Sequence, residues 1–161
     1  MSSIFTLALE EPFSVRIEVM TDPKQVLEAG RAILDPLLTK HGFVWVSGVS
    51  GSSSGGQFAS GQYLRANRRL EIHFRHSLGL VTYHVGPHRV QHAEYMRALL
   101  GSAGGNQYPG FSKEPLDAFR HLAHDLRRFC GTFLDGSDEE FECIVAQAVA
   151  ASKPTGIKRL P

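Results

Sequence analysis

The sequence predicts a single α+β domain in which an antiparallel β-meander of about four to six strands is packed on one face by about four helices. Three segments in the middle of the chain, residues 58–65, 69–76 and 80–85, are typical of strands and are separated by short turn signals. The segments around them carry apolar residues at helical spacing. A chain of 161 residues, 42% of them hydrophobic, can bury one core without disulfide bonds. We therefore expect one domain over residues 1–152 and a tail over 153–161.

The N-terminal part of the chain predicts strands followed by a helix. Alternating apolar residues indicate a half-buried strand over residues 13–19, and residues 4–9 predict another strand or an arm. An exposed edge at these strands would permit a homodimer. Asp22 and Pro23 mark a helix start, as N-cap and first helical residue, and Gly42 marks the helix end.

The next stretch has few apolar side chains to bury. Residues 48–56 read GVSGSSSGG, and ordering such a segment costs much conformational entropy, so we expect a mobile loop. Residues 51–55 match the G-x-S-x-G pattern of serine hydrolases by letter. That motif acts on a sharp turn from a strand into a helix, whereas here a strand follows. A serine nucleophile is therefore not expected.

The C-terminal half is predicted to be mostly helical. A helix is expected over residues 90–100, and a second begins at Ser112 and carries an apolar stripe as far as Phe133. Ser137 and Glu140 form a capping box that starts the last helix.

Several apolar side chains of this half are expected to be buried. Phe111 and Tyr108 lie in the long loop after the first of these helices, where Phe111 is expected to plug the space beneath the loop. Cys130 and Cys143 lie in apolar helical patterns and are expected to be buried free thiols.

The hairpin over residues 69–86 carries the most information. If Ser77 and Leu78 form the turn, antiparallel pairing predicts one apolar face made by Phe74 opposite Val81, Ile72 opposite Tyr83 and Leu70 opposite Val85. The other face then carries Arg75 opposite Leu80, His73 opposite Thr82 and Glu71 opposite His84.

This second face has three interpretations: a solvated surface, a binding surface and a catalytic site. A pair between Glu71 and His84 would raise the pKa of the histidine and orient its ring. The candidate catalytic residues are Glu71, His73 and His84, and the candidate binding residues are Arg69, Arg75 and Thr82.

A spacing of four relates three histidines around the end of the hairpin. His88 and His92 would share one face of the helix after Pro87, and His84 could complete a metal site. The HExxH pattern of zinc proteases is absent, because Arg89 follows His88. We therefore expect no metal and no other cofactor; the metal-ligand candidates are His84, His88 and His92, with Glu94 as an alternative to His84.

The charge of the chain gives little reason to expect a polyanionic partner. A basic cluster lies near Tyr63 and consists of Arg65, Arg68 and Arg69. Such a cluster beside an aromatic residue is found in nucleic-acid-binding surfaces, but the formal net charge of the chain is only +1. No apolar run approaches the roughly 20 residues needed to span a bilayer. The N-terminus lacks the basic region of a signal peptide. We expect no nucleic acid, no membrane and a cytoplasmic location.

The order of a helix, Leu38-x-x-x-Gly42-Phe43, a Gly-rich gap and an Arg/aliphatic meander resembles small uncharacterised bacterial α+β domains, some of which act as immunity proteins beside toxins. The resemblance covers about residues 22–86 and assigns a role to no residue. It implies a non-enzymatic bacterial protein that binds another protein. The alternative is a small hydrolase or metal-assisted enzyme that uses the His/Glu face of the meander.

Overall fold

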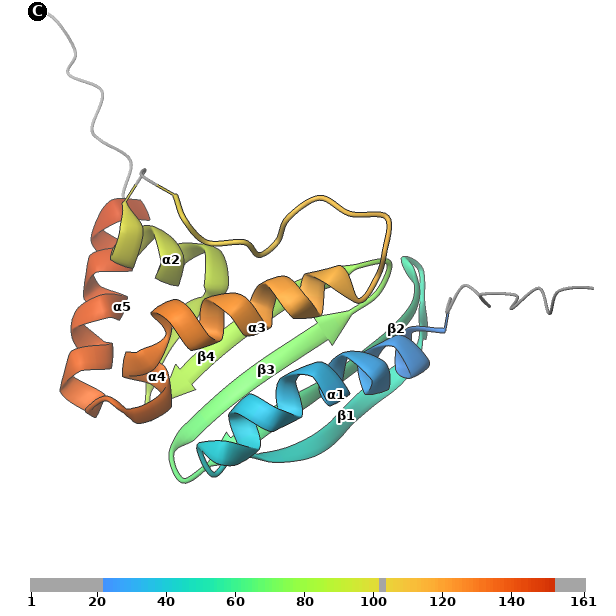
Figure 1. The fold of residues 1–161 in the computed structure, drawn as a ribbon, viewed down its shortest axis with the longest axis horizontal. Helices are drawn as coiled ribbons and strands as arrows, with labels where there is room; N and C mark the ends of the chain where they lie inside the picture. Colours follow the sequence, from blue (N-terminus) through green and yellow to red (C-terminus); the bar gives the residue numbers. More distant parts are fainter. Residues whose placement is uncertain (1–21, 102–103, 153–161) are drawn as a thin grey trace, which may run out of the picture.

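The computed structural model describes residues 22–101 and 104–152, which form a five-stranded antiparallel sheet and five helices (Figure 1). The strands lie in chain order: β1 (Val44–Ser53), β2 (Gly56–Arg65), β3 (Arg68–Phe74), β4 (Leu78–Val85) and β5 (His88–Gln91). The helices are α1 (Pro23–Lys40), α2 (His92–Leu100), α3 (Asp117–Phe129), α4 (Gly131–Asp135) and α5 (Asp138–Ser152). The predicted α+β meander is confirmed. The predicted strands over 4–9 and 13–19 and the tail lie outside the described residues.

The helices cover one face of the sheet. α1 and α3 lie side by side across it, and α2 packs with α5 near β5 (Figure 1). The strands contribute to the core beneath them through alternate residues, among them Tyr63, Leu70, Ile72 and Tyr83, all without exposed surface. This arrangement leaves the alternate set of strand side chains pointing away from the helices.

Two helix starts follow the predicted capping chemistry. The Asp22 side chain accepts a hydrogen bond from the Lys24 backbone N–H at 3.1 Å, with Pro23 at the first helical position. Ser137 and Glu140 cap α5 reciprocally, each side chain accepting from the other's backbone N–H at 3.1 Å. Both predicted caps are confirmed.

The Gly/Ser-rich stretch is a strand, so the prediction of a loop over residues 48–56 is wrong. β1 continues to Ser53 and turns through Ser54 and Gly55 into β2. At an irregularity in the pairing, the Ser60 hydroxyl accepts from the Val49 N–H at 3.1 Å and donates to the Val49 carbonyl at 3.0 Å. Hydrogen bonds to β2 thus hold the strand where side-chain burial does not.

The β3–β4 hairpin keeps its predicted faces but not its predicted register. Ile72 pairs with Val81 and Leu70 with Tyr83, which is a shift of two residues. Leu78 is buried and pairs with Phe74, so it belongs to β4 and not to the turn. Because side chains alternate with a period of two, the shift leaves every side chain on its predicted face.

Two helix starts and the burial of one cysteine in the second half differ from prediction. Residues 88–91 form β5, since Val90 pairs with Tyr83, and the following helix begins only at His92. α3 begins at Asp117 because Pro115 disfavours helical backbone at the residue before it. Cys130 is buried as predicted, but the prediction for Cys143 is wrong, since it lies on an exposed position of α5.

None of the helices in the described part of the chain is both long and apolar enough to cross a membrane.

Candidate functional site

The side chains that point away from the helices form a continuous surface, which we call the outer face. Three cross-strand rows make it up: Val44, Leu64, Arg69, His84 and Arg89; Val46, Gln62, Glu71, Thr82 and Gln91; and Ser60, His73 and Leu80. None of these side chains is buried by any described element. The structure therefore brings together the predicted residues Arg69, Glu71, His73, Thr82 and His84.

Glu71 is the hub of a hydrogen-bond network on the outer face. Its Oε1 lies 3.2 Å from Nε2 of His73, on the same strand, and its Oε2 lies 3.1 Å from Nε2 of His84. Glu71 is directly opposite Thr82, so the predicted pair with His84 forms along a diagonal. The pairing survives the shifted register because a diagonal neighbour is still within reach of these side chains.

The contacts of His84 define its tautomer. An Arg69 guanidinium nitrogen lies 3.2 Å from Nδ1 and 3.4 Å from Nε2, while Nε2 lies closer, at 3.1 Å, to the Glu71 carboxylate. Arginine can only donate, so Nδ1 of a neutral His84 accepts, and Nε2 carries the proton that it donates to Glu71. The two histidines therefore both donate to Glu71, and each of its oxygens accepts a hydrogen bond.

The electrostatics of this network favour an ionised Glu71 and a neutral His84. Burial alone would raise the pKa of Glu71, but hydrogen bonds from His73 and His84 outweigh it and lower that pKa. Burial and the nearby Arg69 guanidinium lower the pKa of His84 by more than Glu71 raises it. Glu71 thus raises the pKa of His84 as expected, but burial and Arg69 outweigh that effect, and the net shift is downward.

Titration of His84 by NMR should show opposite effects of its two neighbours. Glu71→Gln is expected to lower the His84 pKa further, because it removes the carboxylate that stabilises the charged ring. Arg69→Gln is expected to raise it, because it removes a repelling charge. A His84 pKa that is the same in Glu71→Gln and the wild type would contradict the network.

The outer face carries more positive than negative charge. Arg69 and Arg89 lie on it, whereas Glu71 is its one carboxylate among the described residues. Neither arginine forms an ion pair with a described residue. Large apolar side chains are exposed beside these charges: Val44 by 65%, Val46 by 41% and Leu80 by 51%.

A groove of about 510 Å³ opens at the end of the outer face nearest the β3–β4 turn. Phe58 and Leu80 line it with apolar side chains, whereas the side chain of Phe74 is buried in the core. The predicted binding residue Arg75 lies over the Phe58 ring at 5.7 Å and donates to the Ser53 hydroxyl at 3.0 Å. His73 also lines the groove, but Glu71 and His84 do not.

The three metal-ligand candidates point to different places. His84 lies on the outer face, whereas His88 is in β5 on the helix side and faces Glu142 at 3.8 Å. His92 is buried with 1% of its surface exposed. The prediction that His88 and His92 share one helix face is wrong, because only His92 is helical. Within residues 22–101 and 104–152, no group of three or more His, Cys, Asp or Glu side chains could hold a metal ion.

The cluster of Arg65, Arg68 and Arg69 is not one basic surface patch. Arg68 is buried with 6% exposure and donates to the carbonyls of Thr132, Phe133 and Gly136. On the helix side of the sheet, the Arg65 guanidinium carbon lies 4.7 Å from the centre of the Phe43 ring. Only Arg69 points to the outer face, so the cluster serves mainly the fold.

A buried polar network of Tyr83, His92 and Asp125 was not predicted from the sequence. The Tyr83 hydroxyl lies 2.7 Å from Nδ1 of His92, and Nε2 of His92 lies 2.9 Å from Asp125, which has no exposed surface. Asp125 also accepts from the backbone N–H groups of Gln107 and Tyr108. The signal for it was a carboxylate on the apolar stripe of α3, three residues after Leu122.

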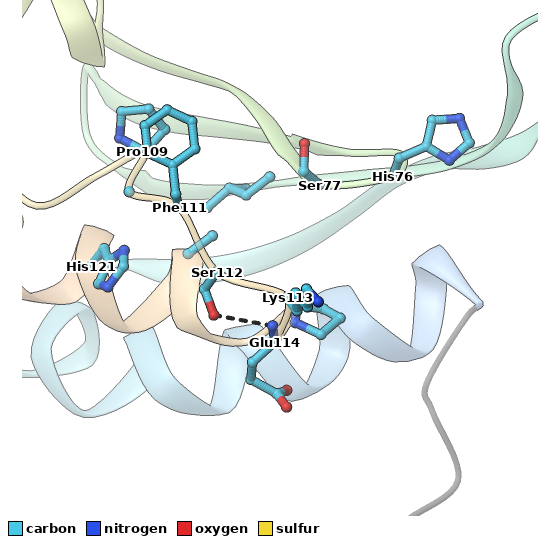
Figure 2. Close-up of a pocket in the computed structure, with 12 residues that line it drawn as sticks. His76, Ser77, Pro109, Phe111, Ser112, Lys113, Glu114 and His121 are labelled. Atoms are coloured by element: carbon cyan, nitrogen blue, oxygen red, sulfur yellow. Dashed lines mark hydrogen bonds between the residues drawn. The ribbon is translucent and has the colours of Figure 1, made fainter.

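A second cavity, of about 370 Å³, lies between the loop over residues 109–115 and the β3–β4 turn (Figure 2). Phe111 is fully exposed, so the prediction that it plugs the space under the loop is wrong, while Tyr108 is buried there as expected. Gly110 has a φ of +50°, and a Cβ there would lie 2.3 Å from Nδ1 of His121. The cavity is lined by one cation, Lys113, and one anion, Glu114, so its charge favours no class of ligand.

Comparison of the chain with protein-family models, curated proteins and solved structures found no match in any of the three.

Proposed function

We propose that this chain is a non-enzymatic protein-binding domain that contacts its partner through the outer face. The observation that carries the proposal is that exposed aliphatic side chains share a sheet face with arginines that form no ion pair with a described residue, and no described element covers this face. Surface of this mixed composition is typical of protein interfaces, in which apolar contacts are surrounded by polar groups.

An immunity-type role in a bacterium, with a toxin as the partner, is one form of this proposal. A cytoplasmic location fits it, because both cysteines are free and the cytoplasm keeps thiols reduced.

The enzymatic alternative, with Glu71, His73 and His84 as its residues, has less support. A general base works best with a pKa near the working pH, but the hydrogen bonds from His73 and His84 lower the pKa of Glu71. The groove that would hold a substrate is lined by His73 alone of these three residues.

Affinity capture with matched variants tests the proposal. Leu80 and Val149 are both aliphatic and are 51% and 52% exposed, but Val149 lies on α5. We expect Leu80→Asp to lose the captured partner, because it places an unpaired charge in an apolar contact, and Val149→Asp to retain it. Equal capture by the two variants would contradict the proposal. A circular dichroism melt of each variant checks that both remain folded.

A further inference from the structure

The groove at the end of the outer face has the size and the walls of a side-chain pocket. Its volume of about 510 Å³ lies within the usual range of ligand sites. Phe58 and Leu80 supply the apolar wall, and Gly79 adds no side chain to obstruct it. An apolar side chain of a bound molecule would therefore find contact surface here.

Arg75 is held at the wall of this groove, and one of its guanidinium nitrogens donates to Ser53. Its guanidinium lies over Phe58 and donates to Ser53, which restrains it before any ligand binds. A guanidinium has five N–H donors in a planar fork that matches a carboxylate. Among the described residues, Arg75 forms no ion pair.

The surroundings of Arg75 add to its preference for an anion. His73 lines the same groove, and 44% of its side chain is exposed. Arg69 and Arg89 lie on the same face, and the Glu71 carboxylate is already bound by two imidazoles. An acidic ligand would thus meet complementary charge, whereas a basic one would be repelled.

We infer that the groove recognises an acidic segment of the partner protein, with an apolar side chain against Phe58 and Leu80 and an adjacent carboxylate on Arg75. The inference rests on the proposed function and names the chemistry of the partner. Nucleic acid fits less well, since the three arginines of this face fall short of the roughly six to ten phosphate contacts of a nucleic-acid binder.

NMR titration of the full chain with two peptides tests the chemistry directly. The probe is acetyl-Glu-Glu-Phe-Glu-Glu-amide, and its uncharged control replaces each Glu with Gln. We expect the acidic peptide to shift the resonances of Phe58, Gly79 and Leu80, and the Gln peptide to bind about tenfold more weakly or worse. Raising the salt concentration from about 50 mM to about 500 mM should weaken the binding of the acidic peptide, because salt screens the charges.

Two arginine variants locate the carboxylate. Arg75→Gln is expected to reduce the affinity of the acidic peptide about tenfold, because the fork is lost. Arg97→Gln, at an exposed position of α2, should bind like the wild type. Equal binding of the two peptides, or wild-type affinity in Arg75→Gln, would overturn the inference. So would an oligothymidylate that moves these resonances when the acidic peptide does not.

The captured partner separates this inference from the proposed function. If Leu80→Asp loses the partner while Arg75→Gln and high salt leave capture unchanged, the outer face binds a protein but the acidic recognition is wrong. If Leu80→Asp and Val149→Asp capture equally, the proposed function fails, whatever the peptide does. Loss of capture in both Leu80→Asp and Arg75→Gln supports the proposed function and the recognition of an acidic segment.

Discussion

Asp125→Ala is expected to lower the free energy of unfolding by about 3–5 kcal/mol, the usual cost of removing one partner from a buried charged network. Asp125 has no exposed surface and accepts hydrogen bonds from His92, His124 and the backbone N–H groups of Gln107 and Tyr108. Alanine would leave the donors of His92 and Tyr108 buried without an acceptor. Urea unfolding followed by circular dichroism measures the change.

The same variant should alter the pH dependence of stability. Burial alone would raise the pKa of Asp125, but its hydrogen bonds outweigh this and hold it below the ordinary value of 3.8. The carboxylate therefore stabilises the fold fully above that ordinary pKa, and the contribution is lost as the pH falls through the lower pKa of the folded state. Asp125→Ala should unfold with a flatter dependence at acid pH. As a control, Glu139→Ala at an exposed position of α5 should change stability little, and equal losses in the two variants would contradict the assignment.

Arg68→Ala is expected to cost about 3 kcal/mol, because it removes charge-assisted hydrogen bonds to three backbone carbonyls of the α4 region. The side chain, only 6% exposed, joins the start of β3 to the end of α4 and also reaches Asp138 at 3.4 Å. Thermal and urea unfolding would report the loss.

The neighbouring arginine provides the control for Arg68. Arg69 points to the opposite face of the sheet, so Arg69→Ala should destabilise much less. Arg68→Lys should fall between the wild type and Arg68→Ala, because an ammonium keeps the charge but cannot reproduce the planar fork. If Arg68→Ala and Arg69→Ala unfold alike, Arg68 does not have the role described.

The faces of the hairpin could be predicted from the sequence, whereas its register could not. Alternation of apolar and polar residues assigned Leu70, Ile72 and Tyr83 to the core, and each is fully buried. A shift of two residues leaves this alternation unchanged, so the pattern alone cannot distinguish the two registers. The turn decides between them, and the burial of Leu78 placed the turn earlier than expected.

The candidate site was predictable only as a set of outward residues. Arg69, Glu71, His73 and His84 follow from the alternation, and the structure brings them into one network. The groove could not be predicted, because Phe58 and Ser53 come from another hairpin. Likewise, the closeness of Arg65, Arg68 and Arg69 in the sequence does not reveal that the first two lie on the helix side of the sheet.

The glycine-rich stretch shows a further limit of local composition. Residues 48–56 have little side-chain surface to bury, which is why a loop was expected. Their place in β1 depends on hydrogen bonds to β2, including those of Ser60 with Val49. Such pairing is a tertiary property that no reading of the stretch alone supplies.

The central claim is that the outer face is the surface that meets another protein. Carbene footprinting of the captured complex tests it most directly, by comparing the labelling of exposed aliphatic side chains with and without the partner. Val46 and Leu80 should lose labelling on binding, while Val149 on α5 should keep it. Unchanged labelling of Val46 and Leu80 together with protection of Val149 would contradict the claim.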